Sequence, residues 1–494
     1  MTRARAAVAA GFAAAVLCSC AGIRFGGPAS RGLTAEPPAR YPSARFAVFS
    51  DPHLYDADLG IQGAAFQRDM DTDRKLLPES REILSAAIGQ VSASGAGFLL
   101  IPGDLTKDGE RQNHLLMAAQ LSALSRTGVR VYVVPGNHDI LNPHAIRYDG
   151  SMRTRVPNVS PAEFAEIYKD AGYGEAIIRD PGSLSYVAEP VPGLWLLAID
   201  SANYADNPRR SVPVTRSGLT PSRVAWIESM LGRAIELHNA VIVMLHHGVV
   251  EHFAGQSKYF PRYLLDDWQG ASDMLAAYGV SVVFTGHFHA QSAAVRRTAG
   301  GRSIYDVETG SLVTFPDPVR IVTIDAGTQK MTIESSFIKD LPSFTARGVD
   351  FWEYSRTFVL AGTTKIAMQS LKHYGISDKE AAVIAGQVAA AFAAHFRGDA
   401  HFTGSEMIGT RGLSLMAGII VGLRRDLVAG LWHHTEPPDN DLVIDLARPY
   451  VLARASSSSA SRALGTVSSG FTLYQARWIT PFSSMRNDDR MMPL

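Results

Sequence analysis

The order of hydrophobic and polar positions predicts alternating strands and helices over the first two thirds of the chain. Six short runs are almost continuously apolar, which is typical of strands buried on both faces of a sheet. They are Arg45–Ser50, Gly97–Ile101, Val129–Val134, Leu194–Ile199, Ala240–Leu245 and Val280–Thr285. Helical patterns separate them, at Glu79–Ser92, Gly109–Ser125, Pro161–Lys169, Pro221–Leu237 and Ala271–Tyr278. This alternation indicates an α/β fold from about Tyr41 to Asp340.

The pattern changes toward the C-terminus. Four runs alternate apolar and polar residues and predict antiparallel or edge strands, at Ser183–Val187, Ser303–Val307, Val319–Ile324 and Met331–Ser335. After about Leu341 the chain becomes helical and rich in Ala, Leu and Ile, at Thr363–His373, Lys379–His395 and Leu413–Leu431. The most apolar part, Leu413–Leu423, is far too short for a transmembrane span and is expected to pack inside the protein. We therefore predict a mainly helical subdomain over residues 341–494 that packs on the α/β part or shapes its entrance. Within this subdomain, the low-complexity composition of Ser456–Ser461 predicts that these residues form a mobile loop.

The first 20 residues are predicted to be a targeting segment rather than part of the fold. Arg3 and Arg5 precede an apolar stretch, Ala6–Leu17, that is too short to span a bilayer in the mature protein. The following Leu17-Cys18-Ser19-Cys20-Ala21 resembles a bacterial lipoprotein signal, which implies cleavage before Cys20 and a lipid on its thiol. An ordinary secretory signal is the alternative. Either kind of signal predicts an exported protein of the cell envelope. Residues 21–40 are expected to form a flexible tether.

Composition narrows the possible partners and ligands. The 494 residues include 47 basic and 47 acidic side chains, and this balance gives no support to a nucleic-acid polymer as partner. The length allows two or more domains, and we expect the first to cover residues 41–340. The only cysteines are Cys18 and Cys20. The folded part therefore has no disulfide and no thiolate ligand, so any metal must be held by His, Asp and Asn.

Short motifs of Asp, Asn and His follow five of the predicted strands, at the point where each strand ends. They are Asp51-Pro52-His53, Gly103-Asp104, Gly136-Asn137-His138-Asp139, His246-His247 and Gly286-His287-Phe288-His289. Each could be an ordinary turn or a solvated loop when it is taken singly. In open α/β sheets, however, ligands bind beyond the carboxyl ends of the strands, where all five motifs lie. The set supplies enough oxygen and nitrogen donors for two metal ions that share one carboxylate. Unrelated structural residues are the less favoured alternative.

In this order the five motifs resemble those of the calcineurin-like metallophosphoesterase superfamily. The resemblance covers roughly Arg45 to His289, with trailing strands to about Asp340. It implies an α/β fold, the four-layer αββα metallophosphoesterase sandwich, to which the C-terminal helical subdomain is an addition. It also implies a phosphoester hydrolase that uses two divalent metal ions. The donor types suit Mn, Fe or Zn, and the sequence does not choose among them.

The resemblance assigns a role to each residue of the motifs. The first metal would be held by Asp51, His53, Asp104 and His289, and the second by Asp104, Asn137, His246 and His287, with Asp104 bridging. A metal-bridging hydroxide would attack phosphorus in line with the leaving oxygen. His138 would stabilise the transition state or protonate the leaving group. Asp139 would orient His138 by accepting its other N–H.

Residues near the motifs leave some alternatives open. His246 is preferred over His247 as a ligand because it directly follows the strand Ala240–Leu245. His247 is expected to support a ligand or contact the substrate. Lys107 stands at about the position where purple acid phosphatases have a tyrosine ligand, which argues against their ferric centre.

The remaining candidates are less specific. His144 and Glu251-His252 could border the pocket, and Lys107 and Arg147 could contact phosphate. We expect Asp56, Asp58 and His114 to be solvated surface residues and Tyr55 to make packing contacts.

Together these observations predict an exported, lipid-anchored, dinuclear metal-dependent phosphoesterase. The motifs Gly103-Asp104-Leu105-Thr106 and Gly286-His287-Phe288-His289 are similar to those of bacterial phosphodiesterases, which favours cyclic nucleotides or glycerophosphodiesters as substrates. A phosphomonoesterase or nucleotidase of the same fold is one alternative. A catalytically silent, surface-anchored binding protein is another, although the complete ligand set argues against it. The sequence does not indicate the oligomeric state.

Overall fold

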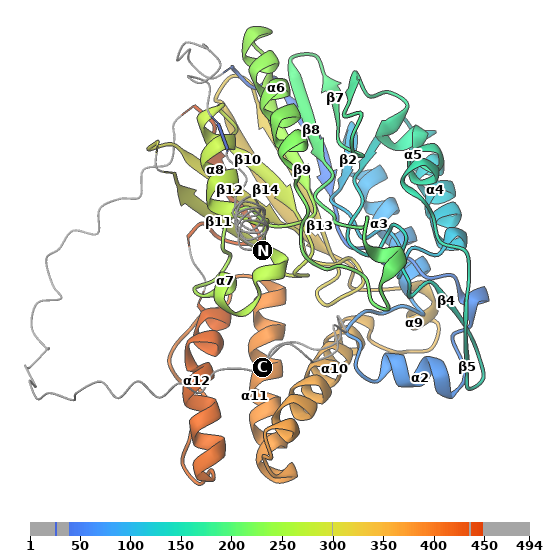
Figure 1. The fold of residues 1–494 in the computed structure, drawn as a ribbon, viewed down its shortest axis with the longest axis vertical. Helices are drawn as coiled ribbons and strands as arrows, with labels where there is room; N and C mark the ends of the chain where they lie inside the picture. The colour runs from blue at the N-terminus through green and yellow to red at the C-terminus, as the bar shows by residue number, and fades with distance from the viewer. Residues whose placement is uncertain (1–24, 27–38, 299, 434–435, 448–494) are drawn as a thin grey trace, which may run out of the picture.

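A computed structural model gives the fold, and the structure describes residues 25–26, 39–298, 300–433 and 436–447 (Figure 1). The predicted targeting segment, most of the predicted tether and the Ser456–Ser461 loop lie outside these residues. Within the described part, the β-strands form two large sheets and one separate hairpin.

The first sheet has six strands in the order β15-β14-β13-β1-β2-β3. Three strands run parallel: β1 (Ala44–Val48), β2 (Phe98–Ile101) and β3 (Arg130–Val133). Three more are added antiparallel: β13 (Pro318–Asp325), β14 (Lys330–Phe337) and β15 (Leu442–Asp445). Because β15 comes after the C-terminal helices, the last described segment of the chain returns to the edge of this sheet.

The second sheet has seven strands in the order β11-β12-β10-β9-β8-β7-β6. Its parallel strands are β8 (Leu194–Ile199), β9 (Ala240–Leu245), β10 (Val282–Thr285) and β12 (Ser303–Glu308). The edges are antiparallel: β11 (Ser292–Arg297), β7 (Tyr186–Val191) and β6 (Ile178–Arg179). The separate hairpin consists of β4 (Ile146–Asp149) and β5 (Met152–Arg155).

Helices cover the outer face of each sheet, so the protein has four layers. The first sheet is covered by α3 (Ser80–Ala93) and α4 (Arg111–Ser125), and the second by α6 (Pro221–Glu236) and α8 (Trp268–Ala277) (Figure 1). Strand β8 shows how the sequence builds these layers. Leu194, Leu196 and Ala198 enter the core between the sheets, and the alternate residues Trp195, Leu197 and Ile199 enter the core with α6 and α8. The predicted four-layer αββα sandwich is confirmed.

Shorter helices lie in the connections: α2 (Ala64–Met70), α5 (Pro161–Ile167), α7 (Gln256–Tyr259) and α9 (Pro342–Thr345). The six apolar strands predicted from the sequence agree with the structure to within about two residues at each end. Thr220 caps α6 by accepting from the amide of Arg223, and Pro221 occupies the first turn. Strand β7 begins at Tyr186, later than the predicted Ser183, and the sequence patterns missed β11 and β15.

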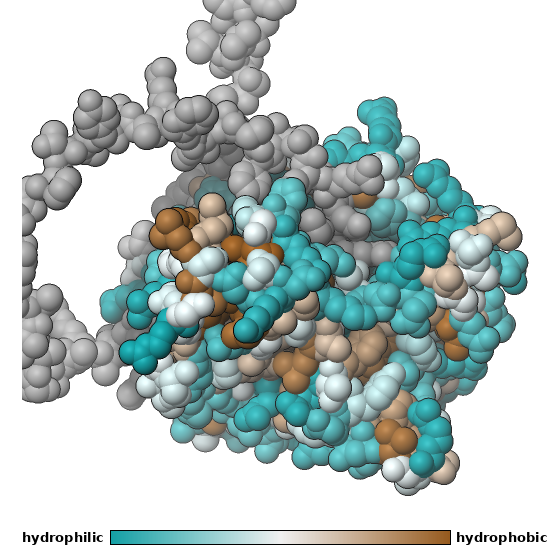
Figure 2. Space-filling model, turned by 90° about the horizontal axis from the view of Figure 1, so that it is seen from below, coloured by the Kyte–Doolittle hydropathy of each residue, from teal (hydrophilic) through white to brown (hydrophobic). Residues whose placement is uncertain are grey.

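Three long helices follow the sandwich and extend from one end of it: α10 (Phe351–His373), α11 (Asp378–Arg397) and α12 (Leu415–Trp432) (Figure 1). Their inner faces form one buried cluster with Phe253, Phe260 and Phe288, which follow the strands that carry the His motifs. None of the helices in the described part of the chain is long and apolar enough to cross a membrane. Apolar side chains gather on the side of this end where α12 lies (Figure 2), and Leu415 and Leu423 are exposed there.

Candidate metal centre

The two sheets meet at their strand ends, and the five motifs come together there. Asp51 and His53 follow β1, Asp104 follows β2, and Asn137 and His138 follow β3 of the first sheet. From the second sheet, His246 follows β9, and His287 and His289 follow β10. Parallel strands of both sheets thus direct their carboxyl ends to one place, as the sequence predicted.

Sharp backbone turns aim these side chains. Positive φ angles occur at Asp51 (50°), His53 (37°), Asp104 (50°), His287 (78°) and His289 (68°). Side chains other than glycine rarely adopt such angles, and each costs on the order of 1–3 kcal/mol that the surrounding structure must offset. The turns bend the chain directly after each strand, so that a ligand side chain points back toward the sheet edge.

Two glycines of the motifs are required by the close approach of the ligands. A Cβ atom on Gly136 would clash with the carboxylate of Asp104, and one on Gly286 would clash with Ser50 and with the carboxylate of Asp51. These glycines allow two strand ends to lie against the carboxylates without a side chain between them.

The donor atoms form two overlapping groups. In the first, Oδ1 of Asp51 lies 3.4 Å from Nε2 of His289, which lies 3.2 Å from Nε2 of His53. In the second, Nε2 of His246 lies 3.3 Å from Oδ2 of Asp104 and 3.1 Å from Oδ1 of Asn137. His287 also belongs to the second group. The same Oδ2 of Asp104 lies 3.7 Å from Nε2 of His53, so Asp104 stands between the groups.

These residues fit a pair of divalent ions. The buried Oδ1 of Asp51 has no hydrogen-bond partner among the described residues, although it faces two imidazole nitrogens. Burial lowers the pKa of His53 and of His287 well below the usual range, which favours the neutral imidazole that binds metals. A buried, unpaired carboxylate oxygen among neutral imidazoles calls for a cation. The mixed oxygen and nitrogen donors suit borderline ions such as Mn, Fe or Zn.

His138 stands beside the assigned ligands and lies close enough to His53 and Asp104 to form a third candidate group with them. Its Nδ1 lies 2.7 Å from the carbonyl oxygen of Lys107 and 3.0 Å from Oδ1 of Asp108, and its Nε2 lies 4.0 Å from Oδ2 of Asp104. Burial disfavours the charged ring, but the carboxylate of Asp104 and the hydrogen bond to Asp108 outweigh it and raise the pKa of His138 to about 9. The ring therefore presents Nε2 to the pocket while Nδ1 is held.

The predicted role of Asp139 in orienting His138 is wrong. The carboxylate of Asp139 instead accepts hydrogen bonds from the amides of Leu105, Thr106 and Gly136, at 2.9–3.1 Å. It thereby ties the loop after β2 to the loop after β3. Asp108, four residues beyond Asp104, occupies the position expected of Asp139, and no motif in the sequence indicated it.

His247 is buried and fully engaged. Its Nδ1 lies 2.9 Å from the hydroxyl of Ser201 and its Nε2 lies 2.9 Å from the carbonyl oxygen of Thr215. With both ring nitrogens occupied, His247 supports the ring of His287, whose centroid lies 4.5 Å away. This arrangement agrees with the choice of His246 as the ligand.

His114 is buried rather than at the surface as predicted, because α4 turns it inward to Tyr168 and the carbonyl oxygen of Asp139. His252 is also buried, 3.5 Å from Asp306 and 3.7 Å from Glu308. His144 borders the pocket, as the sequence suggested.

Lys107 is buried and pairs with Asp108, with its ammonium 5.9 Å above the ring of Tyr55. Tyr55 itself is buried and donates to the carbonyl oxygen of Gly60, which is the packing role that was expected. Arg147 lies exposed on β4.

Asp56, on the loop after the first motif, accepts from the amide of Asp58 and from the side chain of Gln112 on α4. Both acids lie at or near the surface, as predicted. Neither is among the residues that line the pocket.

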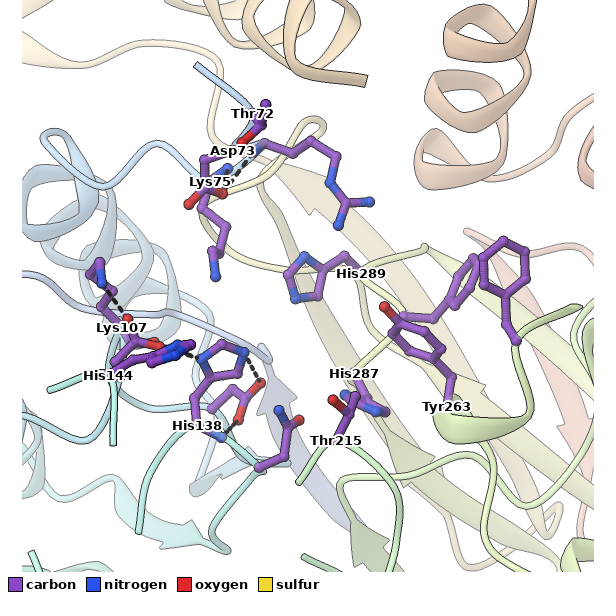
Figure 3. Close-up of a pocket in the computed structure, with 16 residues that line it drawn as sticks. Thr72, Asp73, Lys75, Lys107, His138, His144, Thr215, Tyr263, His287 and His289 are labelled. Carbon is purple, nitrogen blue, oxygen red and sulfur yellow. Dashed lines mark hydrogen bonds and ion pairs between the residues drawn. The ribbon is translucent and has the colours of Figure 1, made fainter. Parts of the chain in front are cut away.

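The pocket over the ligands has walls that the sequence patterns did not reveal (Figure 3). One wall is the segment Thr72–Lys75, and the other includes Phe260, Tyr263 and Phe288. The ring of Tyr263 lies 4.5 Å from that of His287 and is tilted by 34° to it. Phe288 belongs to the last His motif, whereas Phe260, Tyr263 and the segment Thr72–Lys75 come from connections without a motif.

The four-layer fold and the cluster of metal-binding side chains at its strand ends place the protein among the metallohydrolases. The sequence model of the calcineurin-like phosphoesterase family matches residues 44–291, about half of the chain, and the protein belongs to this family. It is therefore a metal-dependent phosphoester hydrolase. No curated protein shows significant sequence similarity to the chain.

Many solved structures are similar to parts of the chain, among them the following three. A dimetal phosphatase from Danio rerio is 15% identical, with a TM-score of 0.43, over 60% of this chain and 97% of that one. A purple acid phosphatase from yellow lupin (Lupinus luteus) seeds is 12% identical, with a TM-score of 0.35, over 61% and 52%. A predicted phosphoesterase from Streptococcus pneumoniae is 11% identical, with a TM-score of 0.25, over 60% and 91%.

Proposed function

We propose that the protein hydrolyses phosphodiesters and that His138 acts on the leaving group. The observation that carries the role of His138 is its position, fixed through Nδ1 by Lys107 and Asp108 and facing the pocket with Nε2. A ring held in this way can donate a proton to a leaving oxygen without first reorganising.

The two groups of ligands define the place of the reacting phosphorus. When bound, two divalent ions would supply an activated water and neutralise charge on the phosphoryl oxygens. Asp51, His53 and His289 would hold one ion, Asn137, His246 and His287 the other, and Asp104 both. His138 then lies beside the phosphoryl group, within reach of a leaving oxygen in the same pocket.

A diester carries a second organic group on phosphorus, and the pocket offers a surface for it. The rings of Phe260, Tyr263 and Phe288 line the wall next to His287. Apolar burial of an ester group on such rings favours a diester over the smaller, more highly charged monoester. The similarity of the motifs to those of bacterial phosphodiesterases supports the same choice.

The test is the turnover of bis(4-nitrophenyl) phosphate and of 4-nitrophenyl phosphate by the purified protein after loading with Mn²⁺, Fe²⁺ or Zn²⁺. We expect a higher kcat/KM for the diester and about two metal equivalents by elemental analysis. A preference for the monoester would contradict the diester proposal. Failure to hydrolyse either ester, with less than one equivalent of metal, would instead support a silent binding protein.

We further propose that the protein is exported and lipid-anchored at Cys20. The supporting observations are the paired arginines, Arg3 and Arg5, the short apolar stretch after them and the cysteine that follows. Mass spectrometry of the mature N-terminus tests this proposal, and we expect a diacylated Cys20. An unmodified N-terminus at another position would indicate an ordinary secretory signal.

A further inference from the structure

The wall formed by Thr72–Lys75 places a lysine over the metal centre. Lys75 points into the pocket, toward the space between His138 and His289 (Figure 3). The residue is half-buried. The segment is not part of any ligand motif and precedes α3 in the chain.

The ammonium of Lys75 has no counter-ion among the described residues. Its backbone amide donates to Oδ1 of Asp73 at 3.0 Å, but no carboxylate pairs with its side chain. The neighbouring cation in the pocket, Lys107, is by contrast buried and paired with Asp108. Lys75 is therefore the pocket lysine whose charge is left for a ligand.

The positive charge of Lys75 acts on histidines of the metal centre. Burial lowers the pKa of both His53 and His289, and the positive charge of Lys75 lowers each further. It also opposes the rise in the pKa of His138. Lys75 is thus electrostatically close to the ring that faces the leaving group and to two ligands of one metal.

The segment that carries Lys75 is fixed by the C-terminal helices. Lys365 on α10 lies 2.7 Å from Oδ1 of Asp71, and Gly362 on α10 lies directly against the carbonyl oxygen of Asp73. On the other side, the guanidinium of Arg74 lies 5.8 Å above the ring of Phe396 on α11. Lys75 therefore enters the pocket from a supported backbone, which reduces the entropy cost of binding an anion.

We propose that Lys75 determines specificity by binding a negative charge on the leaving group, so that the preferred substrates are phosphoesters whose leaving group is itself anionic. This inference rests on the proposed function. The ligand residues and His138 face the reacting phosphoryl group. Lys75 extends from the Thr72–Lys75 wall toward the space between His138 and His289. A half-buried ammonium without a partner is costly until a ligand supplies the opposite charge.

A matched substrate pair tests the inference. Two chromogenic methyl phosphodiesters would share a carboxy-nitrophenol leaving group, one with a free carboxylate and the other with that carboxylate as its methyl ester. We expect the wild-type protein to prefer the free carboxylate in kcat/KM, and K75M to lower this preference about tenfold, mainly through KM. K75R should retain most of the preference, because the charge remains.

The control is K330M on β14, which removes an exposed lysine distant in sequence from the pocket wall. It should keep the wild-type preference, and elemental analysis should find the same metal content in all variants. If K75M lowers kcat/KM equally for both esters, Lys75 contacts the reacting phosphoryl group, and the inference is overturned. An unchanged preference in K75M overturns it as well. If the wild-type protein hydrolyses neither ester, the proposed function fails first.

Discussion

At the scale of single residues, hydrogen bonds to backbone carbonyls decide which imidazole nitrogen faces the metals. Nδ1 of His246 lies 2.8 Å from the carbonyl oxygen of Pro102, which keeps a proton on that nitrogen and leaves Nε2 as the ligand atom. For His287 the partner is the carbonyl oxygen of Arg262, 3.3 Å from Nε2, and Nδ1 remains for the metal. The two carbonyl oxygens thus hold each ring in one orientation toward the site.

Removing a ligand should separate metal binding from the action of His138. We expect Asn137→Ala and His287→Ala to lower the occupancy of the second metal and the turnover together. His138→Ala should keep both metals and lose about 100-fold or more in kcat, because it removes an interaction made with the leaving group. Elemental analysis and kcat on the same samples check this. Loss of metal from His138→Ala would show that its assigned role is wrong.

The corrected roles of Asp108 and Asp139 lead to a second prediction. Asp139→Asn places an amide against backbone N–H donors in a buried site and should lower the free energy of unfolding by about 2–4 kcal/mol. Asp108→Asn weakens the acceptor that holds His138 and should lower kcat about 10-fold or more. Denaturation curves and kcat for the two variants check the contrast. A larger loss of kcat in metal-loaded Asp139→Asn than in Asp108→Asn would contradict it.

The ligand residues could be predicted from the sequence because each is fixed by its own motif at a strand end. Asp108 and Lys75 could not, because their positions depend on how separate loops meet. The resemblance assigns Asp139 to His138, but the turn directs these neighbouring side chains apart, so that His138 faces the pocket and Asp139 binds backbone amides. The surface position predicted for His114 is wrong for a similar reason. Its ring lies on the buried face of α4, where a hydrogen bond with Tyr168 satisfies it.

At the scale of elements, the strands were predictable and the starts of some helices were not. The apolar runs are buried on both faces, so their hydrophobic signal is continuous and ends where the ligands begin. Helix α10 begins at Phe351, twelve residues before the predicted Thr363, because Asp350 caps it by accepting from the amide of Glu353. Its first turns pack on the sandwich through Phe351 and Ser355, and their mixed polarity hid them.

The contact between α10 and the start of β13 should depend on pH. Burial raises the pKa of Asp317 to about 8, although Ser355 donates a hydrogen bond of 2.6 Å to its carboxylate. Between about pH 4 and pH 8 the folded state therefore keeps a proton that the unfolded chain releases, and stability falls as pH rises, by at most about 1.4 kcal/mol per pH unit. An asparagine side chain in place of Asp317 has no proton to release in this range.

We therefore expect Asp317→Asn to gain stability relative to the wild-type protein as pH rises from about 5 to about 8. Thermal unfolding at several pH values within this window checks the prediction, with Ser355→Ala as a control that keeps the titrating group. A difference in Tm between Asp317→Asn and the wild-type protein that stays constant over the window would show that Asp317 is ionised when folded.

At the scale of the whole molecule, the C-terminal helices complete the active site without contributing a ligand. They contact the pocket from two sides, through the Asp71–Lys75 segment and through the aromatic cluster with Phe260 and Phe288. Strand β15 then returns the chain to the edge of the first sheet beside β14. The metals and the chemistry thus depend on the sandwich, whereas the shape and charge of the entrance depend on the helices.

This division predicts a change in substrate binding from a residue far from the ligand motifs in sequence. A Cβ atom on Gly362 would overlap the carbonyl oxygen of Asp73, so Gly362→Ala should push the Asp71–Lys75 segment away from α10. We expect KM to rise several-fold with unchanged metal content, and the free energy of unfolding to fall by about 1–3 kcal/mol. Steady-state kinetics, elemental analysis and denaturation of the same samples measure the three effects.

The matched control is Gly386→Ala on α11, where a Cβ atom would meet nothing within 4 Å. Both changes add the same methyl group to a helix, and helix propensity alone favours alanine by up to about 1 kcal/mol. Gly386→Ala should therefore keep or raise the stability and leave KM unchanged. If Gly362→Ala behaves in the same way, α10 does not hold the wall that carries Lys75, and the entrance is shaped by the sandwich alone.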